Sequence, residues 1–219
     1  MSAATAYARL RDIGAPVITT GEAAAALRVS ESSASRTLAT LADRGLLRRI
    51  RNGLWAIDGG DRDPRAVAAE LTRPFPAYVS FQSALAARGA IDQIPRDLTI
   101  ASLGKPKRVR TAVGTFVIHR LPAELFGGFE ERDGVALATV EKAIFDHLYV
   151  ACASGHPERR LPELDLPADF SERELRSWTA RIASPRLRTL VGRAVSRTLA
   201  HAEHEDPRRG RPSTDGHAR

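Results

Sequence analysis

Cysteines and long apolar runs are scarce in this sequence, and each scarcity excludes a class of protein. A single cysteine, Cys152, excludes an intrachain disulfide and any cysteine-rich zinc site, which is typical of a reducing compartment. No apolar run approaches the roughly 20 residues that a membrane-spanning helix needs, and residues 1–10 lack the apolar segment of a signal peptide. We therefore expect a cytoplasmic protein that has no membrane partner.

The positive charge of the chain is concentrated at its two ends. The formal net charge of the 219 residues is +7, and because lysine is rare it comes almost entirely from arginine. Residues 1–60 carry eight arginines against five acids, residues 61–185 carry seventeen of each sign, and residues 186–219 carry eight arginines against four acids. A positive field at the ends favours a polyanionic partner, although an arginine-rich tail is also typical of a solvated segment.

Two short helices joined by a tight turn are expected near the N-terminus, after a first helix over residues 2–13. Thr20 is expected to cap the second helix, with Glu22 in its first turn, where a carboxylate favours the positive end of the helix dipole. Residues 28–30 form a turn that is long enough only for a sharp crossing of two packed helices. The third helix is expected over residues 32–44.

The third helix has one apolar face and one polar face. Its apolar positions recur at spacings of four, three and four, which predicts a buried stripe of Ala34, Leu38, Leu41 and Gly45. At about 100° per residue the opposite face is polar, and it consists of Ser32, Ser33, Arg36 and Thr40. Such a face suits a major groove about 12 Å wide. An ordinary surface helix would look the same, so this helix alone does not decide.

A basic ribbon follows the third helix. Residues 46–51 and 54–57 flank Asn52-Gly53, the dipeptide that best suits a type I′ turn, because both central residues need positive φ. In that register Ile50 is expected to face Trp55 and cover the helices, with Arg49 and Arg51 on the opposite side. Such a ribbon beside a polar helix predicts a winged helix-turn-helix. The residues expected to contact double-stranded DNA are Ser32, Ser33, Arg36, Thr40, Arg48, Arg49 and Arg51.

The rest of the chain mixes helices with short strands. Strands are expected near residues 97–101, 109–113, 115–121 and 135–138, and helices near 64–71, 81–88, 140–153, 171–182 and 185–203, the third of these capped by Thr139. We predict an α+β protein in which an N-terminal winged helix-turn-helix precedes a mixed α/β domain with a small sheet and C-terminal helices. The expected divisions are 1–60, 61–205 and a disordered tail at 206–219.

No constellation for catalysis or for a cofactor is evident. Glu141 and Asp146 lie five residues apart, about 140° around a helix, so they do not share a site without help. His201 and His204 have helical spacing for zinc but lack companion ligands. The basic cluster at residues 105–110 is expected to be an exposed loop. We therefore expect neither an enzyme nor a bound cofactor or metal.

Several ordered motifs in the middle of the chain resemble those of the AbiEi-type antitoxins of type IV toxin-antitoxin systems. The motifs are Tyr78-Val-Ser-Phe-Gln-Ser-Ala-Leu85, Gly89, Gln93-Ile-Pro95, Phe116-Val-Ile-His119 and Gly134-Val-Ala-Leu-Ala-Thr-Val-Glu-Lys-Ala-Ile-Phe-Asp146. The resemblance covers about residues 15–150 and also places a winged helix at the N-terminus. It supplies no catalytic residue that can be carried over, and it leaves the role of residues 155–219 open.

The resemblance implies two activities. The winged helix would repress the protein's own operon by binding inverted repeats in promoter DNA. The following domain would counteract a cognate nucleotidyltransferase toxin, in the simplest form of such systems without a stable complex. The alternatives are a one-component regulator with a ligand- or protein-sensing domain, and a nuclease that uses carboxylates of the α/β domain. The sequence leaves the oligomeric state, the operator and the toxin open.

Overall fold

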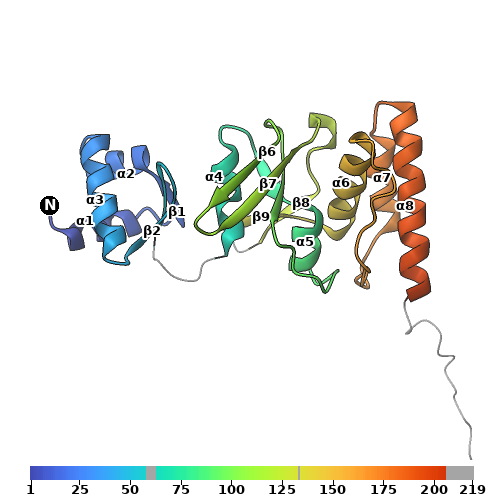
Figure 1. Cartoon of the computed structure of the whole chain (residues 1–219), viewed down its shortest axis with the longest axis horizontal. Helices are drawn as coiled ribbons and strands as arrows, with labels where there is room; N and C mark the ends of the chain where they lie inside the picture. The colour runs from blue at the N-terminus through green and yellow to red at the C-terminus, as the bar shows by residue number, and fades with distance from the viewer. Residues whose placement is uncertain (58–62, 133, 206–219) are drawn as a thin grey trace, which may run out of the picture.

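The computed structural model describes residues 1–57, 63–132 and 134–205, and Figure 1 shows their arrangement. We refer to residues 1–57 as the N-terminal part and to residues 63–205 as the second part. The boundary expected near residue 60 and the tail expected at 206–219 lie outside the described residues. In the described part of the chain no helix is long and apolar enough to cross a membrane.

The N-terminal part consists of three helices and a three-stranded antiparallel sheet. Its elements are α1 (Ala3–Arg11), β1 (Val17–Thr19), α2 (Thr20–Leu27), α3 (Glu31–Asp43), β2 (Leu47–Arg51) and β3 (Leu54–Ile57). The strand order is β1-β3-β2, so β2 is at an edge. Leu10, Leu38 and Trp55 belong to the apolar core between the helices and the sheet. Strand β1 was not expected, because three residues are too few to show a period of two.

The caps of α2 and α3 explain where these helices begin. Thr19, and not Thr20 as expected, caps α2: its hydroxyl accepts from the Glu22 amide at 3.1 Å, and the Glu22 carboxylate accepts from the Thr19 amide at 2.8 Å. The Thr20 hydroxyl instead accepts from the Trp55 indole N–H at 3.1 Å. Ser30 caps α3: its hydroxyl accepts a hydrogen bond from the Ser33 amide at 3.3 Å. The turn expected at residues 28–30 is confirmed.

The second part is built on a mixed six-stranded sheet with the strand order β6-β7-β5-β4-β9-β8. Its strands are β4 (Ala77–Val79), β5 (Leu98–Ser102), β6 (Lys107–Thr111), β7 (Gly114–Arg120), β8 (Phe129–Arg132) and β9 (Val135–Ala138). Its helices are η1 (Pro64–Val67), α4 (Ala68–Thr72), α5 (Phe81–Ala87), η2 (Ala123–Leu125), α6 (Val140–Ala153), α7 (Glu172–Ala180) and α8 (Pro185–Glu205). The α+β class is therefore confirmed.

The elements are stacked in layers along the long axis of the molecule. Figure 1 shows α1–α3, then the small sheet, then α4 and the large sheet, and beyond it α5, α6, α7 and α8. Two expectations about the large sheet were wrong. Strand β8 was not expected, because its exposed residues Phe129–Arg132 show no apolar alternation. Residues 107–110 lie in the edge strand β6 and not in a loop, because each of them pairs with a residue of β7.

The two parts share an apolar core. Val17, Ile50 and Leu54 of the small sheet belong to the same buried cluster as Val67 and Leu71 of the second part. Val67 and Leu71 therefore cover the face of the small sheet that its own helices leave uncovered. The three-stranded sheet is consequently packed on both faces.

Two polar contacts join the same parts at the edge of this core. The Ala112 amide, in the turn between β6 and β7, donates to the Ile50 carbonyl at 3.2 Å. The Arg73 guanidinium lies 2.7 Å from the Glu22 carboxylate, so the carboxylate that accepts from the Thr19 cap is also the ion-pair partner of the second part. These contacts fix the side of the small sheet that faces the second part.

Candidate nucleic-acid interface

Helix α3 presents the polar face that the sequence predicts. Ala34, Leu38 and Leu41 are each 0% exposed, and they face the core of the N-terminal part. Gly45 is not the fourth member of this stripe. It lies after the end of the helix in an exposed turn with φ 72°, a conformation that favours glycine.

The four polar positions of α3 lie together but differ in exposure. Ser32, Arg36 and Thr40 are exposed, whereas Ser33 is half-buried. Their hydrogen bonds are local: the Arg36 guanidinium donates to the Ser33 hydroxyl at 3.4 Å, and the Thr40 hydroxyl donates to the Arg36 carbonyl at 3.0 Å. Arg36 has no ion-pair partner among the described residues, so its charge faces solvent and is open to an anionic or base-edge partner.

The ribbon has a different register from the one expected. Arg49 is opposite Trp55, Arg51 is opposite Leu54, and the register shifts between Arg49 and Arg51, which leaves Ile50 as the extra residue of a bulge. The expected type I′ turn is wrong, because Gly53 has φ 74° whereas Asn52 is not among the described residues with positive φ.

The three arginines of the ribbon lie on two faces, because the bulge moves Arg51 from the face of Arg49 to the face of Arg48. Arg49, opposite Trp55, lies on the face that the helices cover, and its guanidinium is 5.5 Å from the centre of the Trp55 ring. The Asn52 side chain holds it through a hydrogen bond of 2.9 Å. Ile50 faces the second part and not Trp55, contrary to the expectation. The expectation that Arg49 and Arg51 share a face is also wrong.

Arg48 and Arg51 point toward the second part. Arg48 lies on the same face as Val17 and lines a small hollow together with Asp63 and Val113. Arg51 is close enough to Glu70 for its charge to affect that carboxyl. Burial raises the pKa of Glu70, and the nearby charges of Arg73 and Arg51 oppose the rise. Of the three arginines, Arg49 is therefore the one on the α3 side of the sheet.

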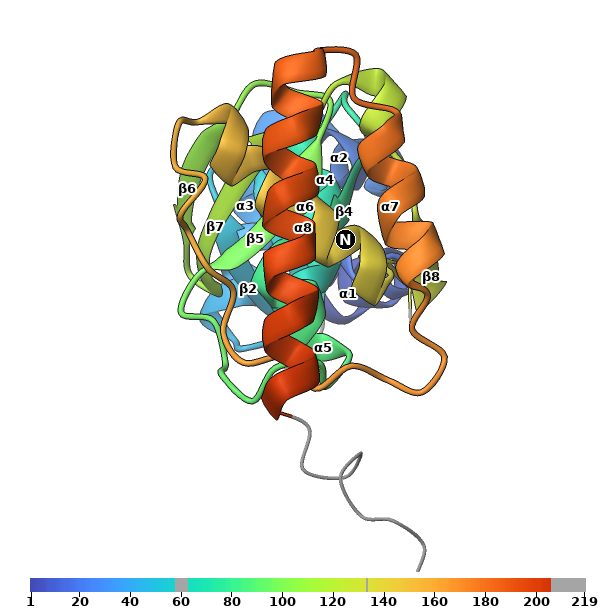
Figure 2. The same cartoon turned by 90° about the vertical axis from the view of Figure 1, so that its right-hand side faces the viewer.

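A second basic strand lies on the same side of the molecule as α3. Lys107, Arg108 and Arg110 are exposed on the edge strand β6, and Arg108 is paired with Asp97 at 2.8 Å. Figure 2 shows α3, β2, β6 and β7 on one side of the long axis, with α1, α7 and β8 on the other. Charged side chains on an edge strand also prevent strand pairing between molecules, so this cluster has a structural explanation of its own.

The residues considered for catalysis have structural partners. Asp146 is 0% exposed, forms an ion pair with Lys142 on the same helix, and accepts hydrogen bonds from Tyr78 at 2.9 Å and from Ser80 at 2.7 Å. Burial raises the pKa of Asp146 and lowers the pKa of Lys142, and their mutual attraction opposes both shifts. The Glu141 carboxylate accepts from the Ser171 amide at 2.7 Å.

This buried network joins two of the sequence motifs. Tyr78 and Ser80 come from the strand-to-helix step at β4, and Lys142 and Asp146 come from α6. Ser80 directly precedes α5, but its hydroxyl donates to Asp146 and makes no cap bond to the helix. Sequence inspection missed the network, although an i, i+4 Lys–Asp pair within an apolar helix was a signal for it. The arrangement fits a structural role, since every donor faces one carboxylate in the core.

No metal-binding cluster of three histidine, cysteine or acidic side chains is present among the described residues. His201 lies on α8, and the side chain of His204 lies outside the described ones. Comparison with models of known protein families and with characterised proteins finds no match, and the resemblance to AbiEi-type antitoxins therefore stays a prediction from the motifs alone.

Proposed function

We propose that the N-terminal part is a winged helix-turn-helix that binds double-stranded DNA, with α3 as the recognition helix. The observation that carries the proposal is the packing of α2 and α3. Ala34, Leu38 and Leu41 turn one face of α3 inward, and the unpaired Arg36 is thereby presented outward on an edge of the molecule. The element order α1, β1, α2, α3, β2, β3 is the order of such a domain.

The proposed contacts follow from where each side chain lies. Arg36, Ser32, Ser33 and Thr40 would face base edges in the major groove. Arg49 would contact a phosphate beside it, because it lies on the same side of the sheet as α3. Arg48 and Arg51, which we predicted from the sequence as further contacts, would reach DNA only if the duplex also passes over the junction with the second part.

The proposed biological role is that of an antitoxin that represses its own operon. Under this proposal the protein binds inverted repeats in its promoter, and the second part counteracts a cognate nucleotidyltransferase toxin. The support is the resemblance of the motifs and the common location of two of them in the buried network around Asp146. The alternative, a one-component regulator that senses a ligand or a protein, uses the same DNA-binding surface but needs no toxin.

Binding of the protein to its own promoter tests the DNA-binding proposal. An electrophoretic shift should show binding that Arg36→Ala weakens by about 1–3 kcal/mol, or roughly 5-fold to 150-fold, if Arg36 contacts a base. Arg186→Ala, an exposed arginine at the start of α8, is the matched control and should leave binding unchanged. Equal binding by both variants and by the original protein would refute the assignment of α3.

A co-expression experiment separates the antitoxin from the one-component regulator. If an adjacent gene encodes a nucleotidyltransferase, its expression should stop growth, and the full chain should restore it. A variant with Arg36→Ala should still restore growth, because the proposed antitoxic activity belongs to the second part. Failure of the full chain to restore growth, while promoter binding persists, would leave the regulator as the better description.

A further inference from the structure

A cavity of about 430 Å³ lies at the end of the molecule far from α3. One wall is the second half of α8, the other is the segment 157–164, and Leu148 of α6 completes the lining. This volume falls in the range of roughly 300–1,000 Å³ that is typical of small-molecule sites. Apart from Leu148, the residues that line the cavity lie outside the region that carries the family resemblance, and the DNA-binding proposal does not use the cavity.

Part of the lining is apolar, and we refer to this part as the floor of the cavity. Leu148 and Ala194 are each 2% exposed and Leu164 is 8% exposed, and Leu161 is half-buried beside them. These side chains come from three different segments of the chain, so the apolar floor depends on the tertiary fold and is not the face of a single helix. An apolar body placed here would remove its own surface and theirs from water.

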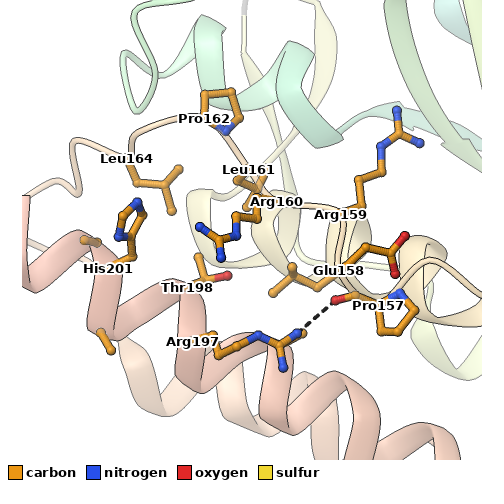
Figure 3. Close-up of a pocket in the computed structure, with 14 residues that line it drawn as sticks. Pro157, Glu158, Arg159, Arg160, Leu161, Pro162, Leu164, Arg197, Thr198 and His201 are labelled. Atoms are coloured by element: carbon orange, nitrogen blue, oxygen red, sulfur yellow. Dashed lines mark hydrogen bonds between the residues drawn. The ribbon is translucent and has the colours of Figure 1, made fainter.

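The rim of the cavity is positively charged. Arg159, Arg160 and Arg197 line it, against the single carboxylate of Glu158. Arg160 has no hydrogen-bond or ion-pair partner among the described residues, and Figure 3 shows its guanidinium directed toward α8 whereas Arg159 is directed away. Arg197 is held by a hydrogen bond of 2.9 Å to the Pro157 carbonyl, so that its position is fixed while further N–H groups remain.

A neighbouring hollow extends the same charge along α8. It shares Arg160 and Arg197 with the cavity and adds Arg193, which also has no partner among the described residues. The charge of Arg159 also affects two buried histidines. Burial is the main cause that lowers the pKa of His147 and of His119, and the charge of Arg159 adds to both shifts.

We propose that this cavity binds a small amphipathic carboxylate, with the apolar body against Leu148 and Leu164 and the carboxylate between Arg160 and Arg197. Guanidinium groups match the planar geometry of a carboxylate and bind it through paired N–H donors. The Thr198 hydroxyl, on the α8 wall, adds a neutral donor. The protein would then carry a ligand site in addition to its proposed DNA-binding surface.

The charge argues against two other occupants. Residues 206–219 follow α8 directly, but they carry four arginines against two aspartates, so the field of the rim disfavours them. Duplex DNA also carries negative charge, but its backbone is too wide for a cavity of 430 Å³ and leaves the apolar floor unexplained. A small acid satisfies both the charge and the apolar walls.

Calorimetric titration of the full chain with 2-naphthoate tests the proposal. Saturable binding with one site is expected, and the neutral 2-naphthamide and inorganic phosphate alone should each bind at least about tenfold more weakly, the order of one charge-assisted hydrogen bond or one buried ring. Equal binding of the amide, or of phosphate alone, would overturn the proposed amphipathic specificity. Displacement of bound naphthoate by a short DNA duplex would assign the rim to nucleic acid instead.

Two variants and one control locate the site. Arg160→Gln should weaken naphthoate binding by about tenfold to a hundredfold, because one charged donor pair is lost. Thr198→Trp should abolish binding by filling the cavity. Arg186→Gln, on the same helix but outside the cavity, should bind as the original protein does. Unchanged binding by either variant with an unchanged circular dichroism spectrum, or no saturable binding by the original protein up to about 1 mM, would refute the proposal.

Discussion

At the scale of single residues, the bulge at Ile50 separates Arg49 from Arg51. Arg49 stays on the α3 side of the small sheet, against Trp55, whereas Arg51 is opposite Leu54 and joins Arg48 on the face toward the second part. The sequence shows three arginines of equal standing, because a pattern of residue types carries no information about a register shift. The positions of Arg48 and Arg51 depend on the contact with the second part, which sequence inspection did not predict.

We predict that Arg49→Ala and Arg48→Ala affect DNA binding unequally. Arg49→Ala should weaken binding to all sequences alike. It should also make the slope of log K against log salt concentration less steep by about 0.9, the value for one phosphate contact. Arg48→Ala should leave that slope unchanged. The measurement is fluorescence anisotropy of a labelled promoter duplex at several salt concentrations. Equal loss of slope in both variants would mean that the duplex also covers the junction with the second part.

The buried imidazole of His147 predicts a loss of stability in mild acid. His147 is 8% exposed, its Nε2 has no hydrogen-bond partner among the described residues, and burial lowers its pKa from 6.5 to about 4. Above pH 6.5 the group is neutral in the folded and unfolded states. Between pH 6.5 and pH 4 only the unfolded state takes up the proton, so the free energy of unfolding falls by roughly 3 kcal/mol at most.

Urea unfolding at pH 7.0 and pH 4.5 checks this prediction. His147→Leu should lose less stability between the two pH values than the original protein, because its unfolded state no longer takes up that proton. Arg9→Ala, at an exposed position of α1, is the control and should keep the original pH dependence. The same loss in His147→Leu and in the original protein would assign the acid sensitivity to other groups.

At the scale of elements, the helices were predicted well and the sheets less so. Helix α6 was predicted from its Thr139 cap and begins at Val140, because an N-cap and an apolar periodicity are local signals. The cap of α2 was misplaced by one residue, because Thr19 and Thr20 are both competent caps and only the Glu22 carboxylate decides between them. The strand expected at 109–113 is confirmed for residues 109–111, but the first two residues of β6, Lys107 and Arg108, were taken for a loop because their charges are exposed.

For the candidate site, the sequence predicted the polar face of α3 and missed what holds it in place. Arg36 and the buried stripe of Leu38 and Leu41 follow from one period of 3.6 residues. The contribution of Trp55, which lies under Arg49 and bonds to Thr20, requires the register of the ribbon. The cavity on α8 could not be predicted, because its walls are far apart in the sequence.

The Asp146 carboxylate is the shared partner of the buried Lys142, Tyr78 and Ser80 side chains. We predict that Asp146→Ala destabilises the fold strongly. Removal of Asp146 leaves the Lys142 ammonium without its counter-charge in the core, which costs about 3–5 kcal/mol. Tyr78→Phe removes a single donor from the same carboxylate and should cost only about 1 kcal/mol. Chemical denaturation of both variants measures the difference. Similar, small losses in the two variants would mean that Lys142 finds another partner.

At the scale of the whole molecule, the small sheet links the N-terminal part to the second part. Its outer face contributes Val17, Ile50 and Leu54 to the larger core, and the Arg73–Glu22 pair joins α4 to the start of α2. Each part therefore buries apolar surface against the other part as well as within its own core. Such a shared core favours unfolding as one cooperative unit.

We predict that the two parts unfold together, and the two tryptophans of the chain can report it. Trp55 lies in the N-terminal core and Trp178 lies beside α6, so Trp178→Phe and Trp55→Phe leave one reporter in each part. The midpoints of urea unfolding seen by the two reporters should coincide. Ile50→Ala, which opens a cavity in the shared core, should lower both midpoints together through a loss of about 2–5 kcal/mol.

Separate midpoints, or an Ile50→Ala effect seen only at Trp55, would contradict the shared core. Arg9→Ala, at an exposed position of α1, is the control for the N-terminal reporter. It should leave both midpoints in place, because such a change alters the free energy of unfolding by no more than a few tenths of a kcal/mol.

Under the proposed function, burial of the small sheet on both faces also sets a condition on the promoter. Because α3 is packed through that sheet onto the second part, two copies joined through their second parts would hold their α3 helices at one separation and one angular phase. The half-sites of an inverted repeat would then have to recur after whole turns of the duplex, about 10.5 base pairs each. Five inserted base pairs would move one half-site to the far side of the DNA, and ten would return it.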